Sequence, residues 1–182
     1  RPNPYTDTGV QAGIDAYYTI LRDLRAAAPN AEFYVLPGNH EQRLQNQLLD
    51  KVPDLQSVRQ AQAAPSADPV LSLPFLLRLP ELKAKWVVAE NGEWPQAQLV
   101  LSKNLIVTHG WIARRGSGTS ARATLEALGC SVIVGHTHRA GMIYRTQHET
   151  DGSLSTHVAV EGGTMCTIPG GLGYARVPDW QN

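Results

Sequence analysis

The sequence is short of cysteine, of net charge and of long apolar runs, and each shortage excludes a class of protein. Two cysteines, Cys130 and Cys166, are too few for a disulfide framework, so a reducing, cytoplasmic setting is the simpler expectation. Sixteen basic side chains balance sixteen acidic ones, which argues against a long electrostatic track for nucleic acid but leaves a local patch open. No run of about 18 apolar residues and no basic-then-apolar leader occurs, so neither a membrane span nor a signal peptide is expected.

Apolar residues are plentiful enough for a core. They make up 42% of the 182 residues, against 18% charged, and this length and composition predict a single folded domain over residues 1–182. Helical spacing and short apolar runs alternate along the chain and then give way to hairpin signals, a pattern typical of an α/β fold. Helices are predicted over 10–28, 41–49 and 119–128, the last closed by Gly129. Strands are predicted over 31–36, 86–89, 98–101, 105–107, 131–134, 142–145 and 154–160, with 86–89 and 98–101 forming a hairpin-like insertion.

Four of the six histidines follow predicted strands closely. They belong to three motifs, Gly38-Asn39-His40-Glu41, His109-Gly110 and Gly135-His136-Thr137-His138. Parallel strands deliver their carboxyl ends to one edge of a sheet, and neutral imidazole is the commonest protein ligand for transition metals, so this order predicts a metal pocket. Gly38 and Gly135 are expected to permit tight turns there, so that bulkier residues would distort the ligand set.

Each motif also has an ordinary structural interpretation. Taken alone, Asn39-His40 indicates a turn, since Asn tolerates left-handed backbone, whereas the three motifs together favour the metal. His148 and His157, in the last predicted hairpin, are assigned a surface or structural role. The four tryptophans are interpreted as packing residues, with Trp111 close enough to His109 to line the pocket.

The ordered motifs resemble those of the calcineurin-like metallophosphoesterase superfamily. The later motifs of that family are GNH[ED], a His-bearing strand end and GHxH. The wider context, in which Arg43 follows the first motif, Ser117-Gly118 lies between the second and third, and Arg139 follows the third, is similar to the phage and bacterial branch. The resemblance implies an α/β fold in which a β-sandwich is flanked by helices, in four α/β/β/α layers.

The resemblance also implies a site and a cofactor. It predicts two divalent metal ions, Mn first, with Fe, Zn or Ni as alternatives. Asn39, His109 and His136 would bind the second metal, His138 would reach the first, and His40 would be the catalytic acid beside the phosphoryl group. Arg43 and Arg139 are second-tier candidates for contact with substrate phosphate, because an arginine that is solvated or paired with a carboxylate is equally common.

One part of the family pattern is missing. Members of the family begin with D-x-H and GDxxD motifs, which supply an Asp and a His for the first metal and an Asp that bridges both metals, and neither motif occurs in this sequence. The upstream aspartates Asp7 and Asp15 follow neither a glycine nor a predicted strand, so neither is assigned to the first metal. We therefore expect an N-terminally truncated fragment that holds about half of an active site.

These observations lead to one functional hypothesis and one rival. The hypothesis is a cytoplasmic or phage-encoded phosphoesterase that hydrolyses phosphate mono- or diesters through metal-bound hydroxide. Its substrate is left open between a nucleotide and a nucleic acid, with the neutral net charge leaning towards a compact molecule. The rival is a non-catalytic metal- or partner-binding domain that keeps the scaffold. The sequence predicts no oligomeric state.

Overall fold

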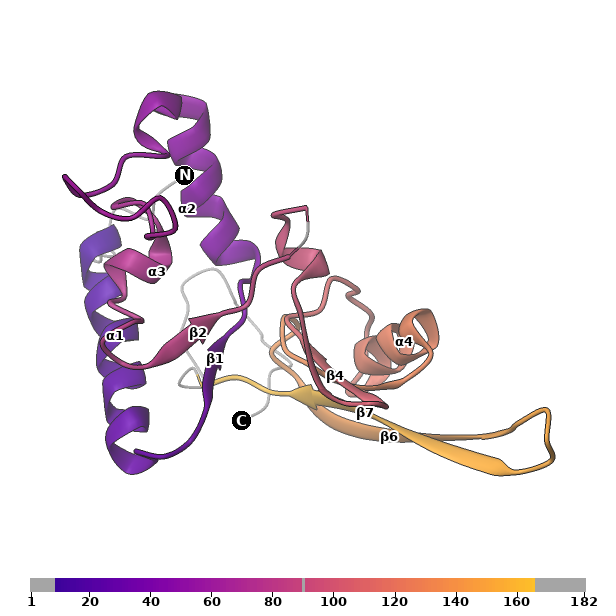
Figure 1. Cartoon of the computed structure of the whole chain (residues 1–182). Helices are drawn as coiled ribbons and strands as arrows, with labels where there is room; N and C mark the ends of the chain where they lie inside the picture. The colour runs from indigo at the N-terminus through magenta and orange to yellow at the C-terminus, as the bar shows by residue number, and fades with distance from the viewer. Residues whose placement is uncertain (1–8, 90, 166–182) are drawn as a thin grey trace. The chain divides into compact units, whose positions relative to one another are not determined.

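The computed structural model describes residues 9–89 and 91–165 of the chain (Figure 1). The chain divides into two compact units, the first ending at Val87 and the second beginning at Val88. Each unit is described by itself, and the predicted single domain over 1–182 stays a prediction. Asp7, Cys166 and one of the four tryptophans, Trp180, lie outside the described residues.

The first unit combines helices with a short parallel sheet. Its elements are α1 (Val10–Ala27), β1 (Phe33–Val35), α2 (Asn39–Lys51), the 3₁₀ turn η1 (Pro53–Leu55), α3 (Leu73–Leu76) and β2 (Ala84–Trp86). Strands β1 and β2 pair in parallel, with Phe33 opposite Ala84 and Val35 opposite Trp86. Figure 1 shows α1 lying along this strand pair.

The core of the first unit forms where α1 meets the segment before β2. Leu21 of α1 and Val35 of β1 are buried together with Leu77, Leu79 and Leu82. Ile14, Tyr17 and Tyr18 of α1 pack around this cluster, as their helical spacing predicts. The packing of α1 on β1 and β2 therefore rests on one apolar stripe of the helix.

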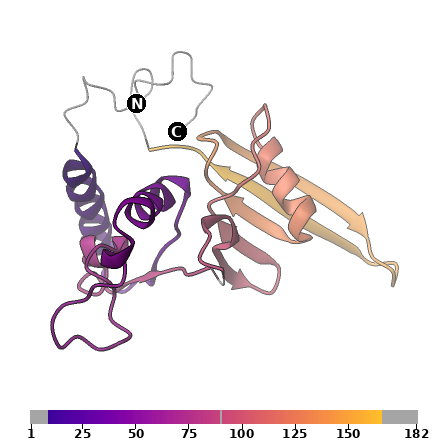
Figure 2. The ribbon, with the colours of Figure 1, turned by 90° about the horizontal axis from the view of Figure 1, so that it is seen from above.

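The second unit is built on a five-stranded mixed sheet. Its elements are η2 (Trp94–Gln96), β3 (Gln98–Ser102), β4 (Leu105–Thr108), α4 (Thr119–Leu128), β5 (Ser131–Val134), β6 (Ala140–His148) and β7 (Leu154–Gly162). The strand order is β3-β4-β5-β7-β6. The central strands β4, β5 and β7 are parallel, and β3 and β6 are antiparallel edge strands. Figure 2 shows α4 across one face of the sheet and the β6–β7 ribbon extending beyond the other strands.

Helix α4 covers the core of the second unit. Its buried Ala121 and Leu125 cluster with Val132, Val134 and Ala159 of the sheet. The helix begins after Gly118 and ends before Gly129, both in the left-handed region, at φ 76° and 70°. Cys130 packs against this cluster, and burial raises the pKa of its thiol, which favours the unreactive protonated form.

The approach of α4 to the sheet demands a glycine on β6. A Cβ at Gly141 would lie 2.4 Å from the Ser117 Oγ and 2.6 Å from the Gly118 nitrogen. The Ser117 hydroxyl also donates to the carbonyl of Ala140. The loop before α4 is therefore held directly on the backbone of β6, which only a residue without a side chain allows.

Most of the predicted elements are confirmed. The chain is α/β; the helix over 119–128, its Gly129 cap and the strand over 131–134 match the structure, and Asp151-Gly152 lies in the turn between antiparallel β6 and β7. Within the described residues, no helix is both long and apolar enough to cross a membrane.

The predicted hairpin between 86–89 and 98–101 is wrong. Strand β2 ends at Trp86 and pairs in parallel with β1, whereas β3 pairs with β4. The turn-forming residues between the two strands mark a connection between the units, and turn chemistry alone does not distinguish such a connection from a hairpin. Helix α2 also begins earlier than predicted, at Asn39.

We predict that the first unit becomes less stable at alkaline pH because of Tyr17. Burial and, secondarily, the negative charge of Glu41 on α2 raise the pKa of Tyr17 from 10.0 to about 12. Between about pH 10 and 12 the unfolded phenol loses its proton and the folded one keeps it, so the free energy of unfolding should fall as pH rises, by up to about 3 kcal/mol. Denaturant unfolding across this range measures the fall.

The variant Tyr17→Phe should lose most of that pH dependence. Tyr144→Phe is the matched control, because Tyr144 is 67% exposed on β6, and it should retain the fall. Equal pH dependence in wild type and Tyr17→Phe would contradict the assignment.

Candidate metal centre

Three parallel strands of the second unit end at the same level. Thr108, the last residue of β4, pairs with Val134, the last of β5, and Val134 pairs with Glu161 near the end of β7. His109 and His136 follow these positions after one and two residues, so both histidines emerge at the carboxyl edge of the sheet. This is the edge at which open α/β sheets usually bind their ligands.

The two histidines face one another across this edge. The Nδ1 of His136 lies 3.3 Å from the Nε2 of His109, and their ring centroids are 5.2 Å apart. Trp94, from η2, contacts both rings, with centroid distances of 5.3 Å to His109 and 5.6 Å to His136. The Trp94 indole thus covers one side of the imidazole pair.

The spacing of the two nitrogens fits a shared cation. Two imidazole nitrogens that face one another repel through their lone pairs unless the proton of a hydrogen bond or a metal ion lies between them. Two nitrogens bound at about 2.0–2.1 Å to one tetrahedral ion lie about 3.4 Å apart. The observed 3.3 Å is close to that value and longer than most protein hydrogen bonds.

The loop that carries His136 has an unusual backbone. His136 and His138 both adopt positive φ, at 64° and 62°, a region that L side chains seldom occupy. The Thr137 N–H donates to the Gly135 carbonyl at 2.7 Å, which closes a γ-turn around His136. Strained non-glycine backbone of this kind concentrates at functional sites.

The buried Glu161 carboxylate supports this loop through hydrogen bonds. Glu161 accepts the Thr137 hydroxyl at 3.3 Å and the Gly118 backbone N–H at 2.6 Å. The Gly135 N–H donates to the His109 carbonyl at 3.0 Å, which ties the two histidine loops together. The loop after β5 is therefore anchored to the neighbouring loop after β4, to β7 and to the start of α4.

The glycine that this site needs is Gly110 and not Gly135. Gly110 has φ 89°, and a Cβ there would lie 3.2 Å from the Val134 Cβ. A Cβ at Gly135 would meet only the His109 carbonyl oxygen, at an ordinary 3.7 Å. A Cβ is therefore accommodated at Gly135, and the expectation that bulkier residues there and at Gly38 would distort the ligand set stays a prediction.

The first motif lies in the other unit, at the start of α2. The Glu41 carboxylate accepts the Gly38 N–H at 2.9 Å, which is half of a capping box. Asn39 and His40 occupy the first turn of the helix, and the exposed Arg43 follows on the same helix. Their predicted convergence with the histidines of the second unit stays a prediction.

Two further predicted residues lie beside the histidine pair in the sequence. His138 is half-buried and contributes the second positive φ of the loop. Arg139 donates from Nη1 to the Arg114 carbonyl at 3.0 Å, which holds the segment before α4. Among residues 9–89 and 91–165, no three His, Cys, Asp or Glu side chains form a group that could hold a metal.

Sequence reasoning missed Trp94 and Glu161. Trp94 was interpreted as packing, and its contact with both histidines depends on the pairing of β3 with β4, in which Gln98 lies opposite Thr108. Recognising that antiparallel pair in the sequence would have placed η2 beside His109. Glu161 ends an apolar run, and a carboxylate at the end of a strand next to the histidine strands was the available signal.

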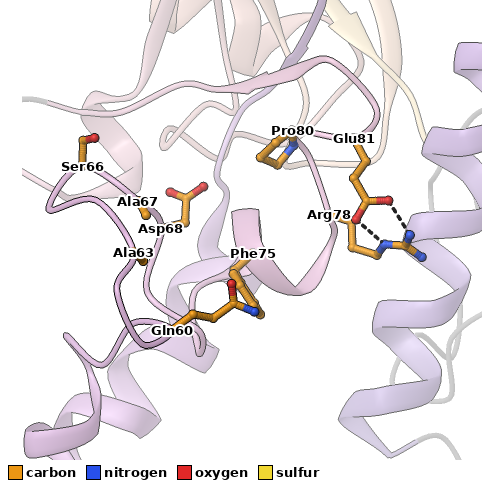
Figure 3. A pocket seen from close by; sticks show the side chains of 9 residues that line it. All are labelled: Gln60, Ala63, Ser66, Ala67, Asp68, Phe75, Arg78, Pro80 and Glu81. Atoms are coloured by element: carbon orange, nitrogen blue, oxygen red, sulfur yellow. Dashed lines mark hydrogen bonds and ion pairs between the residues drawn. The ribbon is translucent and has the colours of Figure 1, made fainter.

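The first unit contains a separate pocket of about 500 Å³ (Figure 3). Phe75 and Asp68 line it, and Arg78 pairs with Glu81 at its edge. None of the predicted site residues contributes to its lining. The pocket is thus distinct from the histidine pair.

Comparison with protein-family models, with curated proteins and with solved structures finds no match.

Gly110 and Gly135 provide a matched test of the loop geometry. Gly110→Ala should destabilise the second unit by about 1–3 kcal/mol, because it combines left-handed backbone with a tight contact. Gly135→Ala should cost less than about 1 kcal/mol. Urea unfolding of both variants measures the difference, and equal losses would contradict the geometry.

Position 136 should favour glycine over alanine. At φ 64° an L side chain costs about 1–2 kcal/mol, so His136→Gly should be more stable than His136→Ala. His148, in regular β6, is the control, where alanine should be the more stable by about 0.5–1 kcal/mol. Denaturant unfolding of the four variants should show that glycine gives the higher free energy of unfolding at position 136 and alanine at position 148. The same order at both positions would contradict the assignment of backbone strain to position 136.

Proposed function

We propose that the chain belongs to a calcineurin-like, metal-dependent phosphoesterase, in which His109 and His136 bind one divalent cation. The observation that carries the proposal is the facing pair of imidazole nitrogens, 3.3 Å apart at the carboxyl edge of the parallel strands. The resemblance of the three motifs supports the reaction class. The four-layer β-sandwich of that family is part of the same proposal.

The remaining residues take roles around this pair. The Asn39 side-chain oxygen would complete the ligands of the same ion, and His138 would bind a second one. Mn is the first choice, with Fe, Zn or Ni as alternatives. A divalent cation bound there would supply a nucleophile at neutral pH by lowering the pKa of water, and it would offset charge on the phosphoryl oxygens.

His40 is proposed to hold the proton that the leaving oxygen receives. A positioned general acid typically contributes a factor of about 10²–10⁴ to the rate. The residue lies next to Asn39 in the first turn of α2, on backbone that the Glu41 cap holds in place. The proton donor and the amide ligand are thus fixed by one helix terminus.

An anionic substrate fits the charges near the histidine pair. Arg139 follows His138 directly and contacts the backbone of Arg114, whose side chain is exposed. These guanidinium groups favour phosphate, and Arg43 on α2 is the further candidate. The neutral net charge of the chain favours a compact nucleotide-like ester over a long nucleic acid.

Metal binding tests the proposal directly. Titration of the whole chain with Mn²⁺ or Zn²⁺ by calorimetry should detect binding. His136→Ala should weaken it by at least about 100-fold, because loss of a residue that only hydrogen-bonds a metal ligand already costs about 10–100-fold. His148→Ala, at the exposed end of β6, should bind like the wild type. In a protein that also carries the D-x-H and GDxxD motifs, hydrolysis of a chromogenic phosphodiester should be lost together with the metal.

His40→Ala separates the acid from the ligands. It should retain the metal and slow turnover, whereas wild-type turnover in His136→Ala would refute the proposed centre. The rival, a non-catalytic metal- or partner-binding domain, is supported by the absence of the D-x-H and GDxxD motifs from this sequence. Metal binding without any turnover in a protein that carries those motifs would favour that rival.

A further inference from the structure

Glu161 is a buried carboxylate at the end of β7. Its side chain belongs to a residue that is only 2% exposed, and it is among the largest fully buried side chains described. A charged group is buried at high cost unless strong partners compensate it. The burial of Glu161, in contact with Thr137 of the histidine loop, therefore calls for a specific structural reason.

The hydrogen bonds of Glu161 join two segments, the start of α4 and the loop that carries His136. One oxygen accepts the Gly118 N–H at 2.6 Å, at the positive end of α4, and the other accepts the Thr137 hydroxyl at 3.3 Å. A carboxylate is an acceptor on both oxygens, so it satisfies two donors that arrive from different directions. The helix terminus further stabilises its charge.

Thr137 is the residue through which this carboxylate reaches the site. It stands between His136 and His138, both at positive φ, and its N–H closes the γ-turn around His136. A strained backbone persists only where its surroundings hold it. The Thr137 side chain provides such a hold, because its hydroxyl donates to the buried Glu161 carboxylate of β7.

We propose that Glu161 is a positioning residue for the metal centre and acts through the Thr137 hydroxyl. It holds the backbone of residues 136–138 in the geometry that presents the His136 Nδ1 to the His109 Nε2. The inference rests on the proposed function, since it assigns a purpose to that geometry. Glu161 itself is not a ligand in this proposal.

The same contact assigns the start of α4 a structural role. A helix N-terminus is a common anion site, and the sequence before α4 is rich in glycine and arginine. The Gly118 N–H is, however, already taken by the Glu161 carboxylate. The Gly118 N–H therefore binds the carboxylate that supports the histidine loop, rather than an external anion.

The test uses Thr137 because Glu161→Ala would also remove the acceptor of the Gly118 N–H. Thr137→Val keeps the shape of the side chain and removes the hydroxyl, and Thr137→Ser restores the hydroxyl. Thr124→Val is the matched control, since Thr124 is 1% exposed in α4 and its hydroxyl donates to the Ser120 carbonyl, away from the loop.

Two readouts are needed, and neither is activity. Mn²⁺ or Zn²⁺ affinity by calorimetry should fall about 10-fold in Thr137→Val. This is the lower end of the loss expected for a residue that supports a metal ligand through a hydrogen bond, because the hydroxyl bond here is long. Thr137→Ser and Thr124→Val should bind like the wild type. In the metal-free protein, amide exchange by NMR should show lost protection at position 137 in Thr137→Val alone.

The outcomes separate this proposal from the proposed function. Wild-type metal affinity and wild-type exchange in Thr137→Val would overturn the role of Glu161. If the wild-type chain binds no metal, the proposed function fails, and unchanged exchange protection at position 137 would then overturn the positioning role independently. Lost protection in Thr124→Val as well would show a general loss of stability and would also overturn it.

Discussion

Hydrogen bonding among the parallel strands β4, β5 and β7 brings the candidate site together. Their register places Thr108, Val134 and Glu161 in one row across the sheet. A slip of one residue in any of these strands would turn every side chain to the opposite face, and the buried core under α4 opposes such a slip. His109, His136 and the supporting carboxylate therefore reach the same edge because the core sets the register.

The site combines strained backbone with rigid support. His136 and His138 occupy left-handed backbone, which an unconstrained loop would assign to glycine. Gly110 on the neighbouring loop has φ 89°, and a Cβ there would lie only 3.2 Å from the Val134 Cβ, which is a tight contact. Two histidines of the candidate site thus occupy the strained positions, and glycine occupies the crowded one; such exceptions to local rules concentrate at functional or strained sites.

The first motif uses its residues in a different way. Glu41 caps α2 by accepting the Gly38 N–H, and Asn39 and His40 become part of the first helical turn. The Glu41 cap thus fixes the backbone from which the Asn39 and His40 side chains extend. The same four-residue motif therefore has a local structural explanation beside the proposed chemical one, and the two are compatible.

The sequence by itself determined the elements whose signals are local. Helical spacing placed α1 and α4, Gly129 marked the end of α4, Asp151-Gly152 marked the β6–β7 turn, and the histidines were recognised as residues that follow strands. Only the tertiary structure decided that β3 pairs with β4, that Trp94 packs on both imidazoles, and that Glu161 lies beneath Thr137. The physical reason is that strand pairing and side-chain contacts join residues far apart in the chain, and they depend on which buried faces fit together and not on the residues adjacent in sequence.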